Sequence, residues 1–236
     1  MTCEWEGELM AIQPFCEEEK WPEATAAIIA YFEQQGRPLV FTGIEKAYAE
    51  FLGQYDGADF EIEDDRDNWD YVYEAEKLIS LSGRKLHSKK NHLNAFRKMY
   101  PQAEYMPITE DIITACKIEL NNWYKLRIQD EPDDPFIGWE RKAIMEIFND
   151  FDYFNLKGGA IRLDDRIIAF TFGEALNADT AVIHVEKADP NIRGAYPAIN
   201  QGFVEHAWSA MTILIARRTW AMKGCAKPRN RTSRSR

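Results

Sequence analysis

The sequence predicts an α+β fold in which helices flank mixed or antiparallel sheets. Residues 158–187 contain three short runs of alternating apolar side chains, separated by turn residues at 164–165 and 177–179. This pattern predicts a three-stranded antiparallel meander. The segments 109–127 and 138–154 before it, and 198–208 after it, have the apolar spacing of helices. Helices set before and after an antiparallel meander are typical of the α+β class.

Nearer the N-terminus, residues 21–36 have helical spacing and end at a glycine, 37–44 suggest a short strand, and 45–55 suggest another helix. Residues 56–73 suggest a hairpin whose strands are FEI and DYVY and whose turn is the acidic DDRDN. Eight acids lie between residues 56 and 70. They could attract a cationic substrate, but a solvated hairpin tip is the favoured interpretation.

The next segment, SGRKLHSKKNHLNAFRK at 82–98, is strongly basic, and no carboxylate occurs from Lys77 to Ala103. Its apolar residues fall on one helical face, with Pro101 as a stop signal. Lys89 projects into that apolar stripe. It is either a snorkelling lysine or a lysine aimed into a ligand cavity.

The net charge of −10 conceals an asymmetry along the chain. Residues 214–236 hold eight basic residues and no acid, which leaves 21 basic against 39 acidic residues elsewhere, or about −18. A protein with this negative charge repels nucleic acid over most of its surface. A phosphate-bearing ligand must therefore be bound by a local basic feature.

Several classes of protein are excluded by what the sequence lacks. The longest apolar stretch is far shorter than the ~20 residues of a membrane-spanning helix, and the N-terminal MTCEWEGELM lacks the basic start and apolar core of a signal peptide. The four cysteines have no C-x-x-C spacing and no two of the four histidines are spaced i, i+4, so no metal site is expected. Without a G-x-S-x-G, a cysteine–histidine pair or a P-loop, hydrolase and kinase functions have no support. We expect a cytoplasmic protein.

A strand followed by Arg193-Gly194 and then a helix can bind an anion, because the first N–H groups of a helix have no internal partner. This order resembles the GNAT acyltransferase fold, whose acyl-CoA pyrophosphate sits on an Arg-Gly-x-Gly turn. Here Tyr196 replaces the second glycine, which argues against ordinary CoA binding. Ser82-Gly83-Arg84-Lys85 repeats the theme earlier in the chain. We therefore expect two GNAT-like units, residues 1–104 and 105–212.

The stretches DYVYEAEKLISLSGRKLHSKKNHLNAFRKMYP and HVEKADPNIRGAYPAINQGFVEHAW resemble the phosphatidylglycerol lysyltransferase C-terminal domain family, over about residues 37–212. The resemblance implies an acyl- or aminoacyltransferase with aminoacyl-tRNA or acyl-CoA as co-substrate and a phospholipid or peptide acceptor. It implies no tightly bound cofactor and leaves the oligomeric state open. The membrane-embedded members carry a large transmembrane region, which this chain lacks. The alternative is a non-catalytic binding module that senses an anionic metabolite or lipid headgroup.

Candidate site residues fall into two groups. Glu186 is the expected general base, Lys187 the expected partner of a developing oxyanion, and Glu174 a second candidate base. A strand-end ion pair is the alternative for Glu186 and Lys187. The donor phosphate is expected to bind Arg84, Lys85, Ser88, Lys89, Lys90, Asn91, Arg193 and Gly194, unless the basic segment is simply a solvated helix face.

The two ends of the chain look unusual against this family. More chain is expected before residue 1. Residues 213–236 are predicted to be a non-native basic tail rather than a nucleic-acid-binding one. One run of codons can encode ILIARRTWAMKGCAKPRN and, in a neighbouring frame, YINREEDMGNEGLRKAKE, which resembles the family's own ending. A single-base deletion near Thr212 would explain this. Gly202, inside a predicted helix at a cost of ~1 kcal/mol, adds to the impression of a damaged end.

Overall fold

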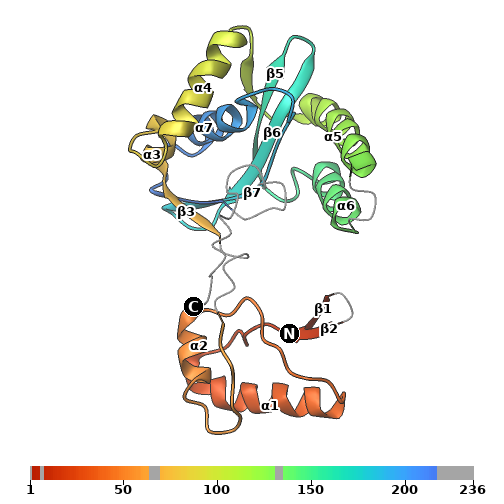
Figure 1. The fold of residues 1–236 in the computed structure, drawn as a ribbon, viewed down its shortest axis with the longest axis vertical. Helices are drawn as coiled ribbons and strands as arrows, with labels where there is room; N and C mark the ends of the chain where they lie inside the picture. The colour runs from red at the N-terminus through yellow and green to blue at the C-terminus, as the bar shows by residue number, and fades with distance from the viewer. Residues whose placement is uncertain (1, 6–7, 64–69, 131–134, 217–236) are drawn as a thin grey trace, which may run out of the picture. The chain divides into compact units, whose positions relative to one another are not determined.

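The structure is a computed structural model that describes residues 2–5, 8–63, 70–130 and 135–216 (Figure 1). The chain forms two compact units, residues 1–68 and 69–236.

The smaller unit combines a two-stranded antiparallel hairpin, β1 (Thr2–Trp5) and β2 (Glu8–Ala11), with the 3-10 turn η1 (Glu18–Lys20) and two helices, α1 (Trp21–Gln34) and α2 (Lys46–Leu52). Its core contains Phe32 and Tyr48, and the Tyr48 hydroxyl lies 2.8 Å from the Thr25 hydroxyl. Both helices were predicted. The strand expected at 37–44 amounts to one isolated bridge between Ala11 and Phe41.

The larger unit is built on a six-stranded sheet with the order β3-β8-β7-β6-β5-β4. Only β7 and β8 are parallel among these described pairs, and the others are antiparallel. Three adjacent strands of this sheet, β7, β6 and β5, are the predicted meander. The bounds are β3 (Tyr71–Glu74), β4 (Glu104–Pro107), β5 (Lys157–Leu163), β6 (Arg166–Ala175), β7 (Thr180–Ala188) and β8 (Ile213–Ala216). The α+β fold class is confirmed.

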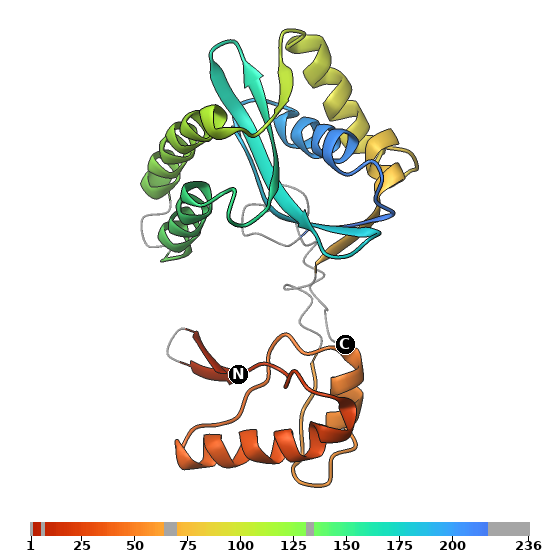
Figure 2. The ribbon, with the colours of Figure 1, turned by 180° about the vertical axis from the view of Figure 1, so that it is seen from behind.

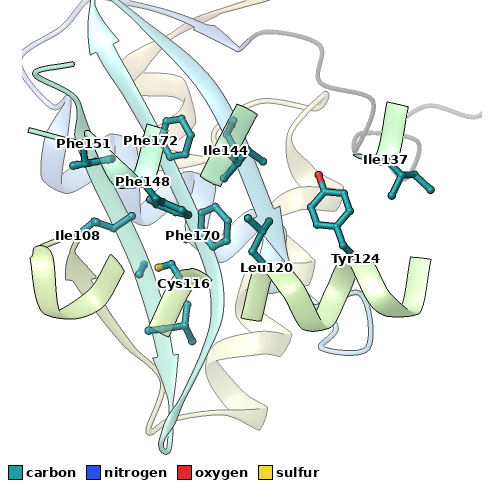
Figure 3. Packing of buried hydrophobic residues seen from close by; sticks show 13 residues of the cluster. Ile108, Cys116, Leu120, Tyr124, Ile137, Ile144, Phe148, Phe151, Phe170 and Phe172 are labelled. Carbon is teal, nitrogen blue, oxygen red and sulfur yellow. The ribbon is translucent and has the colours of Figure 1, made fainter. Parts of the chain in front are cut away.

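Helices cover both faces of this sheet (Figures 1 and 2). On one face, α7 (Ala195–Ala207) packs on β5, β6 and β7, and α3 (Ala75–Ser80) and α4 (His87–Met99) pack against α7. On the other face lie α5 (Glu110–Asp130) and α6 (Pro135–Asn149). The core under α5 and α6 is rich in phenylalanine, with Phe148 packed edge-on against Phe170 and Phe172 (Figure 3).

Two adjacent glycines in β5 are required by packing on opposite faces of the sheet. A Cβ at Gly158 would lie 2.8 Å from Ile108, beneath α5 and α6, and a Cβ at Gly159 would overlap the Tyr105 ring on the other face. Neither position has space for a larger side chain, so the Gly-Gly pair sets how closely β4 and its flanking turn approach β5.

The predicted hairpin at 56–73 is wrong. Residues 60–63 form no strand, and β3 instead pairs with β8, with Tyr71 opposite Ala216. Residues 64–68, the expected acidic turn, lie outside the described residues.

Residues 213–216, the start of the expected non-native tail, form β8 between β3 and β7, and that the tail is non-native stays a prediction. Residues 217–236 lie outside the described part of the chain. Gly202 is not a sign of damage: a Cβ there would lie 3.0 Å from Tyr105, whose ring stacks on His206 with 4.3 Å between ring centres.

The compact units do not coincide with the expected division at residues 104 and 105. β3, α3 and α4 belong to the larger unit, because β3 is an edge strand of its sheet and α4 packs on α7. That residues 1–104 and 105–212 are two GNAT-like units stays a prediction.

Candidate functional site

Among the described residues, the second half of β7 (184–188) has no paired strand on its β8 side, and this stretch is called the open edge. In the described chain, β8 pairs with β7 only from Thr180 to Ile183. Beyond that point the register with β6 shifts, so that Phe172 is opposite Val185 while Gly173 is opposite Ile183. This β-bulge lies near the last β7 residue that pairs with the described part of β8, and bulges are frequent next to active sites.

The direction of the backbone groups on this edge follows from two hydrogen bonds to β6. The Asp189 N–H donates to Ile168 O at 2.8 Å, and the Thr171 hydroxyl donates to Val185 O at 2.7 Å. Backbone groups alternate in direction along a strand. The N–H and C=O of Glu186 therefore face the open edge, where an approaching carbonyl or amide could bond to them.

Glu186 lies on the α7 face of the sheet. The Asn200 side chain donates a hydrogen bond of 2.7 Å to its carboxylate. Burial raises the pKa of Glu186, while the Asn200 hydrogen bond and the charge of Lys89 act in the opposite direction. A carboxylate in this setting keeps its proton to a higher pH than an exposed glutamate does.

Lys89 reaches from α4 toward β3 and β7, which fits both interpretations of the sequence, a snorkelling lysine and a lysine aimed into a ligand cavity. Its side chain is half-buried, and its ammonium lies 5.3 Å from the centre of the Tyr73 ring on β3. Because Lys89 also acts electrostatically on Glu186, α4, β3 and β7 contribute to one group of side chains with Asn200 of α7.

Lys187 follows Glu186 but lies on the opposite face, under α5 and α6. Its ammonium is 2.7 Å from a Glu140 oxygen, and the Tyr124 hydroxyl donates to the other oxygen of that carboxylate. Arg127 lies 3.8 Å from Glu140. Burial lowers the pKa of Lys187 and the charge of Glu140 raises it. The strand-end ion pair is real, but its carboxylate is Glu140 rather than Glu186.

Glu174 lies apart from Glu186. It is opposite Val182 in the sheet, whereas Glu186 is opposite Thr171. Its carboxylate is half exposed and lies 2.8 Å from the His184 ring nitrogen Nε2. The structure therefore does not bring the two candidate bases together.

The residues expected to bind phosphate occupy two places. Arg193 is exposed just before α7, and Gly194 is the N-cap of α7 with φ of 89°. A Cβ on Gly194 would lie 2.5 Å from the His92 carbonyl oxygen, so this glycine is explained by the approach of α4. On and just before α4, Lys89 is half-buried and the remaining residues are exposed: Arg84, Lys85, Ser88, Lys90 and Asn91.

The sequence analysis missed the neutral and acidic partners of the site. Asn200 is 7% exposed within the apolar helix α7, and Glu140 and Tyr124 lie on two different helices. An asparagine in line with buried Ile199 and Phe203 was the one available signal, because a buried amide needs a hydrogen-bond partner. Nothing local connected Tyr124 with Glu140.

None of the helices in 2–5, 8–63, 70–130 and 135–216 is long and apolar enough to cross a membrane. Over the same ranges, no group of three or more His, Cys, Asp or Glu side chains is placed to hold a metal ion.

A model of the family described as phosphatidylglycerol lysyltransferase, C-terminal, matches residues 1–215. An uncharacterized protein of Mycoplasmoides gallisepticum is 30% identical over 147 residues, which is 60% of this chain and 46% of that protein. The chain thus spans less than half the length of this curated relative.

Solved structures show the same fold. A conserved protein of unknown function from Bacteroides thetaiotaomicron superposes over 92% of this chain and 73% of its own, with a TM-score of 0.79 and 29% identity. The C-terminal domain of a putative lysylphosphatidylglycerol synthetase from Agrobacterium fabrum superposes with a TM-score of 0.58 and 13% sequence identity. The superposition covers 88% of this chain and 63% of that chain. The structure of L-PGS from Bacillus licheniformis superposes with a TM-score of 0.55 and 11% sequence identity, over 91% of this chain and 65% of that chain.

Proposed function

The chain belongs to the phosphatidylglycerol lysyltransferase C-terminal family, and from that premise we propose that it transfers an acyl or aminoacyl group from a phosphate-bearing donor to an amine or hydroxyl. The observation that carries the proposal is Glu186, held by Asn200 at the open edge of β7 with its pKa raised. Perturbed carboxylates at such positions are candidates for acid–base chemistry.

In this mechanism Glu186 acts as the general base. Its carboxylate takes a proton from the attacking amine or hydroxyl, which adds to the donor carbonyl. When the carbonyl re-forms, the bond to the ester oxygen or thioester sulfur breaks, and the leaving group takes the proton back from Glu186. A base with a pKa closer to neutral is more effective at this step. The Glu186 N–H, which faces the open edge, is suited to stabilise the oxyanion that develops on the carbonyl.

Lys89 and the exposed cations of α4 are proposed to hold the donor phosphates. Lys89 connects the two functions, since it starts from the basic helix and acts on Glu186. The donor is proposed to be aminoacyl-tRNA or acyl-CoA, and the acceptor a phospholipid or a peptide. The protein is proposed to need no tightly bound cofactor.

A second candidate is a non-catalytic binding module of the same fold, which would sense an anionic metabolite or lipid headgroup. The packing of α4 onto Gly194 favours it, because that contact fills one side of the expected phosphate turn.

Mass spectrometry of small molecules and tRNA that co-purify with the protein would identify the donor. A transfer assay with that donor then compares Glu186→Gln with Glu104→Gln, a surface glutamate that pairs with Arg162 at 2.8 Å. We expect E186Q to lower the rate about 10²- to 10⁴-fold and E104Q to leave it unchanged. An E186Q rate equal to the wild type would eliminate Glu186 as the base, and ligand binding without turnover would favour the binding module.

A further inference from the structure

Two consecutive side chains in the buried middle of α7, Asn200 and Gln201, are polar, and they are 7% and 5% exposed. Consecutive residues of a helix point about 100° apart, so the two amides reach different neighbours. Asn200 bonds to the sheet, through its 2.7 Å hydrogen bond to Glu186 of β7. Gln201 bonds instead to α3 and α4.

The Gln201 amide makes three hydrogen bonds. Its Oε1 accepts one from the Arg97 guanidinium at 3.1 Å. Its Nε2 donates to the Ile79 carbonyl oxygen at 3.2 Å and to a Glu205 carboxylate oxygen at 2.8 Å. One partner is a donor and two are acceptors, so the position needs a side chain that can both accept and donate. A glutamate lacks the donors, and an apolar side chain would lose all three bonds.

Two of these partners lie on the helices that flank the basic loop 81–86. Ile79 is in the last turn of α3, where carbonyl groups have no partner within the helix, and Arg97 is in the last turn of α4. The loop begins at Leu81, which is 3% exposed and has a left-handed φ of 46°. Gln201 therefore ties the helices on both sides of this loop to α7.

These bonds add direction to a contact that is otherwise apolar. Phe96 of α4 and Ala198 of α7 belong to one core cluster. Apolar contacts are non-directional, whereas a fully satisfied buried hydrogen-bond network makes the elements that it joins more rigid.

We infer that Gln201 is a positioning residue, which holds α4 and the loop 81–86 in a fixed place relative to Glu186. Asn200 and Gln201 together then join the candidate base on β7 to the cations that are proposed to bind the donor phosphates. The inference rests on the proposed transferase function. Because Gln201 acts through those cations, its loss weakens donor binding rather than the chemical step.

The first experiment measures amide hydrogen exchange of the full chain by mass spectrometry and needs no turnover. Gln201→Met keeps the size of the side chain and removes its three hydrogen bonds. Glu205→Ala is the matched control, because it removes only the bond that stays within α7. Arg97→Met, at an exposed position, removes only the bond to α4, and Lys98→Met controls for its lost charge at the next exposed position.

Exchange of the loop 81–86 and of α4 should be at least about tenfold faster in Q201M than in wild type, with β6 unchanged. R97M should accelerate exchange in α4, and E205A and K98M should match wild type. Wild-type exchange in a folded Q201M would overturn the inference, and so would an equal acceleration in β6, since Gln201 would then contribute only to general stability. If Q201M does not fold, equal exchange in R97M and K98M overturns it.

The second experiment is the transfer assay with the donor that co-purifies. Q201M should raise KM for this donor about tenfold and leave kcat unchanged, while E205A should leave both unchanged. An unchanged KM, or a fall in kcat alone, would overturn the positioning role. Failure of the proposed function is seen separately: a full rate in E186Q would eliminate the proposed base but would not alter the exchange result for Gln201.

Discussion

Removing Glu140 is expected to destabilise the protein far more than removing its partner Lys187. The Lys187 side chain is 8% exposed and its ammonium lies 2.7 Å from Glu140. Glu140→Ala leaves that ammonium buried beside the Tyr124 ring, 5.5 Å from its centre, and also deprives the Tyr124 hydroxyl of its acceptor. Lys187→Met leaves Glu140 with the Tyr124 hydrogen bond and with Arg127 at 3.8 Å.

The magnitudes follow from burial. Breaking a buried ion pair by removing one partner costs about 3–5 kcal/mol when a charge is left uncompensated, which is the situation in E140A. In K187M the carboxylate keeps other donors and the methionine fills the apolar space, so we expect a loss of about 1–2 kcal/mol. Replacing both residues, as in Glu140→Leu with Lys187→Met, should return the stability to within about 1 kcal/mol of wild type.

Urea unfolding at neutral pH measures these differences, with circular dichroism and tryptophan fluorescence followed together so that the transitions of the two compact units are separated. Glu104→Ala is the matched control, because its pair with Arg162 is on the surface, with side chains 64% and 48% exposed. It should change stability by no more than about 1 kcal/mol. Equal losses in E140A and K187M, or a loss in E140A no larger than in E104A, would refute the reasoning.

Three further outcomes are expected. Burial raises the pKa of Glu186, so the folded state binds this proton more tightly than the unfolded state does. The stability that Glu186 contributes therefore falls as pH rises from the ordinary glutamate pKa through the raised value. In a pH series of urea unfolding, E186Q should flatten this fall, and an unchanged slope would contradict the expectation. Gly173→Ala should lower the free energy of unfolding by about 3 kcal/mol or more, because its Cβ would overlap the Val182 carbonyl oxygen. Gly138→Ala in α6, where a Cβ would have nothing within 4 Å, should raise it by about 0.5–1 kcal/mol in the same unfolding assay. Gly194→Ala should lower the melting temperature, since φ of 89° and a main-chain oxygen of α4 both oppose a Cβ; a wild-type melting curve would show that α4 yields easily.

The meander was predictable because its evidence is local. Alternation with a period of two, interrupted by Asp164-Asp165 and by the turn at 177–179, specifies three strands and two connections within 31 residues, 158 to 188. The strand that pairs with β3 was not predictable, because alternation indicates a strand but does not indicate which strand it pairs with. The adjacent FEI run looked like a partner, yet the actual partner, β8, lies almost at the end of the described chain.

The site was predictable in part. The apolar stripe of the basic segment correctly placed Lys89 among inward-facing residues. The expectation that Glu186 and Lys187 form an ion pair was inconsistent with strand geometry, because consecutive side chains of a strand point to opposite faces of the sheet. Lys187 instead pairs with Glu140, because α5 and α6 pack on this face of the sheet. Such a tertiary contact between separate elements leaves no local pattern for sequence reasoning to detect.

The place of β8 in the sheet has a consequence for the order of folding during synthesis. β8 lies between β3 and β7, and it is the last strand of the described chain to leave the ribosome. Until it emerges, β3 has no partner and β7 presents a bare apolar edge, while the buried core around Leu214 and Trp208 is incomplete. Exposed edges of this kind favour pairing between nascent chains. We expect the yield of folded protein to depend on how soon residues 213–216 dock, and chaperone dependence to concentrate at that late step.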